Sequence, residues 1–108
     1  MNIKEILEKC SGLKIHEERA NSDEYIEVVV ANTEIDKWHE ACASLLGDAA
    51  KPAGTSPSKE VLKLTDDFGG VSRNQTLYSK SLDEGTVIAM FWPWGNGTQT
   101  TIKIARLK

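Results

Sequence analysis

The sequence predicts a single α+β domain over residues 1–108, in which helices pack on one face of a mainly antiparallel sheet of about five strands. Two observations carry this prediction. Two segments place apolar residues at helical intervals, and about five others are rich in β-branched residues and are separated by turn residues such as Gly and Asn. The expected order of elements is α-β-β-α-(α)-β-β-β, and for the bracketed helix a strand is an open alternative.

The first helix is expected over residues 2–10, where Asn2 is suited to the N-cap and Glu5 follows at the spacing of a capping box. A Ser-Gly pair then ends the helix. The segments 13–20 and 25–31, joined by a polar turn, have the alternation and β-branched content of strands. We therefore expect a hairpin whose first strand lies at an edge of the sheet.

The second helix is expected over residues 32–48, with Thr33 as its N-cap and Gly47 as its end. Its apolar residues fall on one stripe, which is typical of a helix that packs on a sheet. The stripe consists of Ile35, Trp38, Cys42 and Leu45.

A Pro-, Gly- and Ser-rich segment, which we call the central loop, occupies about residues 48–58. It is longer than most connections in small domains, and long loops often carry function. Ser56 and Pro57 are suited to the start of a third helix, which Gly69 and Gly70 would end. A strand over residues 60–65 is the alternative.

The last third of the sequence is expected to form a meander of three strands over residues 75–83, 86–94 and 98–107. Glu84-Gly85 forms the first turn. Asn96-Gly97 is expected to form a primed hairpin turn, because that turn needs positive φ angles at both positions. We call the last two strands and their turn the aromatic hairpin.

Side chains of a strand alternate between the faces of a sheet, so Trp92 and Trp94 should point to one face and Phe91 to the other. The strand is apolar on both faces, whereas helices on one side cover only one face. The central loop, a second copy of the protein or a ligand could cover the second face. Pro93 cannot donate a ladder hydrogen bond, so regular pairing should fail near it and leave Trp94 partly exposed.

The composition, with 40% hydrophobic and 27% charged residues, is that of an ordinary globular protein. The net charge of −3 argues against nucleic acid and membrane as partners. Residues 86–108 hold three basic and no acidic residues, a net +3, whereas residues 1–85 have a net −6. The charged N-terminal segment matches neither a signal peptide nor a membrane anchor, so we expect a cytoplasmic protein with free thiols.

These features favour a small cytoplasmic binding or assembly module rather than an enzyme. The hypothesis places its interaction surface on the aromatic hairpin and the central loop, with Phe91, Trp92, Trp94 and Arg106 as binding residues. The expected partner is another protein or a second copy of the chain, and no cofactor is expected. No sequence motif identifies a catalytic residue.

Two alternatives involve other residues. His39 and Cys42 lie three positions apart on the second helix, and with Cys10 or His16 they could bind zinc or serve a small enzyme. The spacing of these residues is not that of a known zinc motif, and Cys42 lies on the apolar stripe, so no metal site is assigned.

The second alternative is a sheet that binds RNA by stacking bases on Trp92 and Trp94, with Lys103 and Arg106 supplying positive charge. No recognition motif accompanies these residues, and most of the sequence is acidic.

Overall fold

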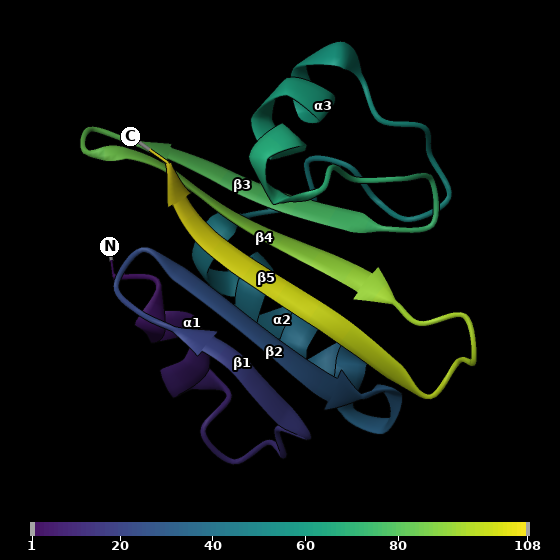
Figure 1. The fold of residues 1–108 in the computed structure, drawn as a ribbon. Helices are drawn as coiled ribbons and strands as arrows, with labels where there is room; N and C mark the ends of the chain where they lie inside the picture. Colours follow the sequence, from purple (N-terminus) through teal and green to yellow (C-terminus); the bar gives the residue numbers. More distant parts are fainter. Residues whose placement is uncertain (1, 108) are drawn as a thin grey trace.

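The computed structural model describes residues 2–107, which form one five-stranded sheet and three α-helices (Figure 1). The helices and 3₁₀ turns are α1 (Lys4–Lys9), η1 (Asn32–Glu34), α2 (Ile35–Leu46), α3 (Lys59–Thr65) and η2 (Asp66–Phe68). The strands are β1 (Glu17–Asn21), β2 (Tyr25–Ala31), β3 (Thr76–Leu82), β4 (Gly85–Pro93) and β5 (Gln99–Leu107). The predicted α+β fold is confirmed, and residues 59–65 form a helix rather than a strand.

The strand order is β1-β2-β5-β4-β3, and every neighbouring pair is antiparallel. The predicted meander of β3, β4 and β5 is confirmed, as is the edge position of β1. β5 lies at the centre of the sheet, where Ile104 pairs with Ile26 of β2 on one side and Ala89 of β4 on the other. The last strand therefore joins the N-terminal hairpin to the C-terminal meander.

The sheet has an apolar core on each face. On one face, α1 and α2 pack against β2, β4 and β5, and α2 lies behind the sheet in Figure 1. Val87, Ala89 and Phe91 of β4 belong to this core, whereas Ile88 and Met90 belong to the core on the opposite face. The predicted alternation along β4 is confirmed.

α3 differs from the expectation that helices pack on one face, because α3 and η2 cover part of the second face. Their apolar side chains pack against Leu77, Ile88 and Met90. These side chains are Val61, Leu64 and Phe68. The second face of β4 is thus covered by a helix of the same chain rather than by the central loop. The central loop instead runs along the outer edge of β3, where Lys51 and Leu77 form a β-bridge.

Two helix starts use the predicted kind of residue at shifted positions, and in α1 the N-cap position is held by Ile3 rather than by Asn2. Asn2 and Glu5 form the reciprocal capping bonds: the Asn2 Oδ1 accepts from the backbone N–H of Lys4 at 2.9 Å, and the Glu5 carboxylate accepts from that of Asn2 at 2.9 Å. For α3 the N-cap is Ser58 rather than Ser56, and its Oγ accepts from the N–H of Val61. The start of α2 differs, because a 3₁₀ turn precedes the helix.

Thr33 lies within that 3₁₀ turn and is not the N-cap of α2. The residue at the N-cap position is Glu34, which makes no side-chain capping bond. The predicted end at Gly47 is confirmed, with φ at 87°.

The turn between β4 and β5 also differs from the prediction. No described residue other than glycine has a positive φ, so Asn96 does not adopt the conformation of a primed turn. Its side chain instead accepts hydrogen bonds from the backbone N–H and the hydroxyl of Thr98. Gly97, with φ at 72°, completes a longer turn, in which its N–H donates to the Trp94 carbonyl at 3.0 Å. We call residues 94–98 the hairpin tip.

No helix in the described range 2–107 has the length and apolar character needed to cross a membrane.

Candidate functional site

Phe91 lies in the core under α2, with 1% of its surface exposed. Its ring stacks on the imidazole of His39, with centroids 3.9 Å apart and planes 17° apart, and contacts the ring of Tyr78 edge-on at 5.6 Å. Phe91 is therefore almost wholly buried, supports His39 from within the core, and reaches the surface only as part of the wall of the cavity described below.

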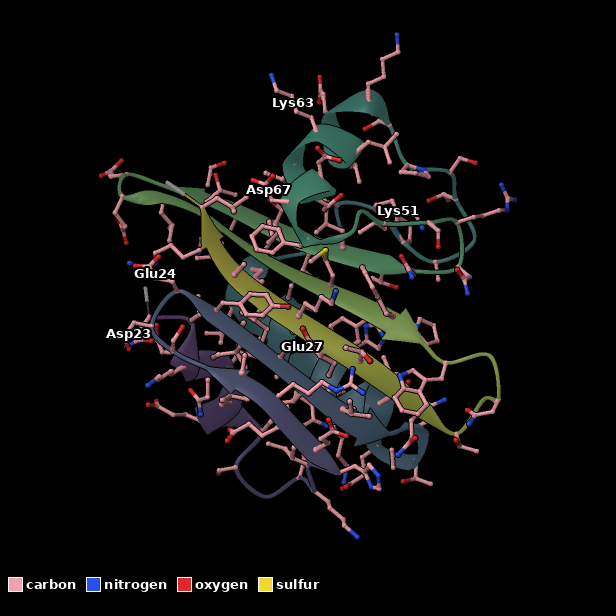
Figure 2. All side chains as sticks on the ribbon, viewed as in Figure 1. Asp23, Glu24, Glu27, Lys51, Lys63 and Asp67 are labelled. Atoms are coloured by element: carbon pink, nitrogen blue, oxygen red, sulfur yellow. The ribbon has the colours of Figure 1, made fainter. Side chains whose placement is uncertain are left out.

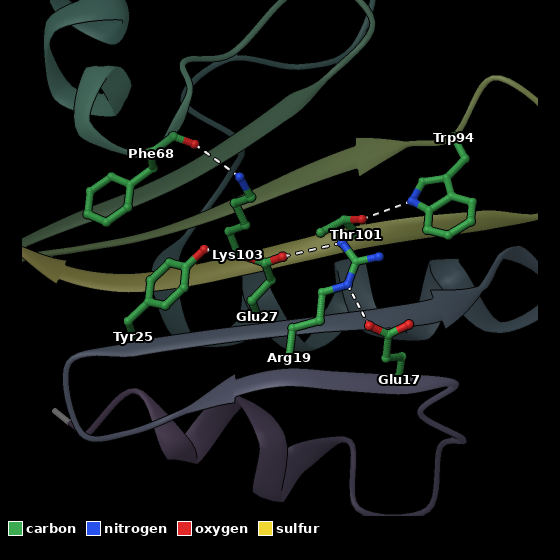
Figure 3. A network of polar contacts seen from close by, with 8 residues as sticks. All are labelled: Glu17, Arg19, Tyr25, Glu27, Phe68, Trp94, Thr101 and Lys103. Atoms are coloured by element: carbon green, nitrogen blue, oxygen red, sulfur yellow. Dashed lines mark hydrogen bonds and ion pairs between the residues drawn. The ribbon is translucent and has the colours of Figure 1, made fainter.

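Trp92 lies on the opposite face and is half-buried. The Nζ of Lys103 sits 3.5 Å from the centre of its ring, a cation–π contact, and also donates to the Phe68 carbonyl at 3.2 Å (Figure 3). Gly69 packs against the far end of the indole. Trp92 is therefore held between the sheet and the turn that follows η2.

Trp94 is half-buried at the hairpin tip, as the sequence predicts. Its indole Nε1–H donates to the Thr101 hydroxyl at 2.8 Å (Figure 3). Its backbone N–H donates to the Gln99 carbonyl at 2.9 Å. Pro93, directly before it, is exposed and pairs only with β5, because the ladder between β3 and β4 ends at Phe91. A proline is tolerated there since no neighbour on the β3 side needs its missing N–H.

The uncovered half of this second face carries a chain of polar contacts across β1 and β2. Arg19 donates to the carboxylates of Glu17 and Glu27 at 2.7 and 3.5 Å, and the Tyr25 hydroxyl donates to Glu27 (Figures 2 and 3). Burial, together with Glu27, raises the pKa of Tyr25. One positive side chain here faces two negative ones, and such a network of charged side chains is typical of the solvated face of an antiparallel sheet.

Arg106 lies on the other face of β5 from Lys103, opposite Val87, and its backbone N–H donates to the Glu24 carbonyl at 2.9 Å. It is therefore at the far end of the sheet from the hairpin tip. The four residues of the predicted interaction surface separate into three places: Phe91 lies in the core, Arg106 at one end of the sheet, and the two tryptophans on the face that α3 and η2 partly cover.

His39 is half-buried on α2, and its Nδ1 lies 2.7 Å from the Tyr78 hydroxyl. Burial lowers the pKa of His39, and the nearby charge of Asp36 opposes part of this effect. Burial also raises the pKa of Tyr78. At neutral pH the pair is therefore an uncharged imidazole and an uncharged phenol joined by a hydrogen bond.

A cavity of about 220 Å³ opens beside His39, where the aromatic hairpin and the central loop meet. The central loop contributes Ala53, and the hairpin contributes Phe91, Pro93 and Thr100. The remaining lining residues are Asn32, Ile35, His39, Asn74 and Thr76. The two segments that the sequence nominates as an interaction surface thus come together at this cavity, which we call the His39 pocket.

Sequence reasoning missed Tyr78, Asn74 and Thr76, because no local pattern relates them to His39. Only the pairing of β3 with β4 brings Thr76 opposite Phe91. The separation of Lys103 from Arg106, in contrast, follows from the sequence alone. Lys103 and Arg106 are an odd number of residues apart, so they had to lie on opposite faces of a regular strand.

The residues considered for zinc do not form a site. Cys42 is fully buried in the α2 core and Cys10 is 3% exposed in the same cluster, and burial raises the pKa of both thiols. His16 is exposed next to β1. Within residues 2–107 no group of three or more His, Cys, Asp or Glu side chains is arranged to hold a metal ion.

Comparisons with models of known protein families, with curated proteins and with solved structures found no match to this chain. The function must therefore be inferred from the geometry of the site.

Proposed function

We propose that the protein is a small cytoplasmic binding module that recognises a protein partner at the end of the sheet where the hairpin tip and the central loop meet. The observation that carries the proposal is the His39 pocket, because segments about forty residues apart in sequence, represented by Ala53 and Pro93, line one cavity. A cavity of this size suits one side chain of a partner, since sites for drug-sized ligands are roughly 300–1,000 Å³.

The surroundings of the pocket support this proposal. Pro93 and the tip residues 95–98 are exposed, and Trp94 is half-buried beside them, with its indole on the opposite face of the sheet from the pocket. Tryptophan is enriched among the residues that dominate binding energy at protein interfaces. The nearby Ala53 is also exposed, so a partner could contact both segments at once.

The hairpin tip is held in one conformation, which reduces the entropy lost on binding. The side chain of Asn32 donates to the Gly97 carbonyl at 2.9 Å, and its backbone N–H donates to the Thr98 carbonyl at 2.9 Å. The Trp94 bonds to Gln99 and Thr101 fix the first residue of the tip. The central loop is tied down as well, because the Gly54 N–H donates to the Arg73 carbonyl at 2.8 Å.

The other candidate functions have less support. A metal-dependent function would need Cys42, which is buried among apolar side chains, and an RNA-binding sheet would need Lys103 and Arg106 on one face. Lys103 is also engaged with Trp92 and with the Phe68 carbonyl. A partner that is itself a second copy of the chain is tested by a native mass spectrum, which reports the oligomeric state together with any bound metal or small molecule.

The proposal is tested by selecting binders from a random peptide library displayed on phage and mapping an enriched peptide by ¹H–¹⁵N spectra. We expect the shifted resonances to cluster at residues 52–56, at the hairpin tip and at His39. Trp94→Ala should weaken peptide binding at least tenfold, an effect typical of an interface tryptophan. Shortening the exposed loop tip, residues 53–55, should have a similar effect.

Leu62 is the matched control, because it is 46% exposed on α3 and contributes to no part of the proposed surface. Leu62→Ala should leave peptide affinity unchanged. Urea unfolding of each variant separates binding from folding. If Trp94→Ala and the loop variant unfold at neutral pH, the hairpin tip serves the core and the proposal fails, and it fails equally if the peptides map to other elements.

A further inference from the structure

We infer that the His39 pocket binds an uncharged hydrogen-bond acceptor, the amide carbonyl oxygen of an Asn or Gln side chain. This inference rests on the proposed function and names the group of the partner that enters the pocket. It follows from which polar atoms of the lining are already used and which are left.

The two amide oxygens of the lining side chains are already engaged in bonds within the protein. The Asn32 Oδ1 accepts from the Thr100 hydroxyl at 2.6 Å, while the Asn32 amide nitrogen donates to the Gly97 carbonyl. The Asn74 Oδ1 accepts from the Ser72 hydroxyl at 2.9 Å. Each of these amide oxygens therefore has at most one lone pair left to accept a hydrogen bond from a ligand.

Donors remain. The Asn74 side-chain amide has two N–H groups, and no described residue accepts a hydrogen bond from either of them. The Thr76 hydroxyl, at the buried end of β3, can also donate a hydrogen bond into the pocket. His39 supplies a third donor if its proton is on Nε2. The tautomer of this imidazole thus decides the chemistry of the pocket.

The contact with Tyr78 fixes that tautomer. Within residues 2–107, His39 is the one side chain or backbone group bonded to the Tyr78 hydroxyl, and Tyr78 is only 6% exposed. Nδ1 is thus the acceptor that the described residues offer to the buried hydroxyl proton, at 2.7 Å from the hydroxyl oxygen. The hydroxyl therefore donates to Nδ1, and the neutral ring carries its proton on Nε2.

Charge selects between possible acceptors. No Asp, Glu, Lys or Arg lines the pocket, and the stacked, half-buried imidazole is neutral. A carboxylate entering it would lose water without gaining a cation, whereas an amide carbonyl loses less solvation and meets the same three donors. The amide plane can also lie along the apolar walls formed by Ile35 and Pro93.

The test uses acetamide, acetate and methylammonium as probes in ¹H–¹⁵N and imidazole ¹⁵N spectra of the whole protein. We expect acetamide to shift His39, Asn74 and Thr76 in a saturable way, with the weak, millimolar affinity of a very small ligand. Acetate should bind more weakly and methylammonium not at all. Tighter binding of acetate or methylammonium, or no saturable shift with acetamide, overturns the inference.

Two variants make the test specific. Thr76→Val keeps the shape of the side chain and removes one donor, so it should weaken acetamide binding by about three- to tenfold. Thr86→Val, at the opposite end of β4, is its control and should leave acetamide binding unchanged.

The imidazole ¹⁵N spectrum should show an unprotonated Nδ1 in the unmodified protein. A protonated Nδ1 contradicts the inference even if the variants fail to fold. If peptides bind at the hairpin tip without placing an amide in the pocket, the proposed function is supported and this inference is wrong.

Discussion

Gly69 packs directly against the indole of Trp92: a Cβ placed at position 69 would come within 2.6 Å of Cη2 of that ring. Gly69 also has a φ of 96°, in the region that residues with a side chain rarely adopt. The turn after η2 therefore needs glycine for two separate reasons, its own backbone and the indole beneath it. The adjacent Gly70, with φ at 79° and no atom near its Cβ position, has only the first.

This difference predicts the effects of two substitutions. Gly69→Ala should lower the free energy of unfolding by about 2–4 kcal/mol, because backbone strain adds to the clash with Trp92. Gly70→Ala should cost about 1 kcal/mol, from strain alone. Urea denaturation measures both. Equal losses for the two variants would show that the contact with the indole contributes nothing to stability.

His39 predicts a pH dependence of stability. Since burial lowers its pKa in the folded protein below the ordinary value of 6.5, the unfolded chain binds the proton more tightly. Stability should therefore rise with pH in the window between the lowered pKa and 6.5, and fall as the pH is lowered through that window. Urea unfolding at pH 5.5 and 7.5 should show this, and His39→Gln should reduce the difference between the two values.

The pKa of His39 in the folded protein can be measured directly by NMR. His16→Gln leaves one histidine, so the remaining ring resonance belongs to His39 and its titration gives the folded pKa. A titration midpoint at or above 6.5 would contradict the predicted burial of the imidazole.

Lys51 anchors the central loop from inside. Only 3% of the residue is exposed, and its Nζ donates to the Arg73 carbonyl at 2.8 Å and to the Gln75 carbonyl (Figure 2). Lys51→Met should therefore lower the free energy of unfolding by about 1–3 kcal/mol, since the Arg73 and Gln75 carbonyls lose a charged donor. Amide exchange in the loop should become faster. The exposed Lys59 is the control, and an equal effect of Lys59→Met would refute the anchoring role.

Cys10 and Cys42 should be unreactive in the folded protein. Both are buried in the α2 core and burial raises the pKa of each thiol, so little thiolate is present or accessible at pH 8. Iodoacetamide should modify them at least about a hundredfold more slowly in buffer than in urea, because modification requires opening of the core. Rapid modification of native protein, or protection that depends on added zinc, would revive the metal hypothesis.

Local patterns in the sequence predicted local structure well. The β-branched run of residues 25–31 matches β2 residue for residue, and the alternation along β4 correctly divided Phe91 from Trp92. These succeed because strand geometry forces successive side chains to opposite faces. The capping-box bonds of Asn2 and Glu5 also depend on neighbours within a few residues, whereas the predicted N-cap Ser56 was two residues from the observed one, Ser58.

Features that depend on distant segments could not be predicted in this way. The side of the sheet that α3 covers is set by how the central loop leaves α2, and periodicity within residues 59–65 carries no information about it. The hydrogen bond between His39 and Tyr78 joins residues 39 positions apart. The candidate site is made almost entirely of such long-range contacts, so the sequence indicated the hairpin and the loop but not the pocket between them.

The central position of β5 has a consequence for the biosynthesis of the protein. A ribosome produces the β1–β2 hairpin and then β3 and β4, but neither β2 nor β4 has its inner neighbour until residues 99–107 emerge. Until that moment both hairpins present open, apolar strand edges, which are sites of aggregation. Premature termination before residue 99 would therefore release two sheet fragments that have no strand to join them, a form suited to capture by chaperones or proteases.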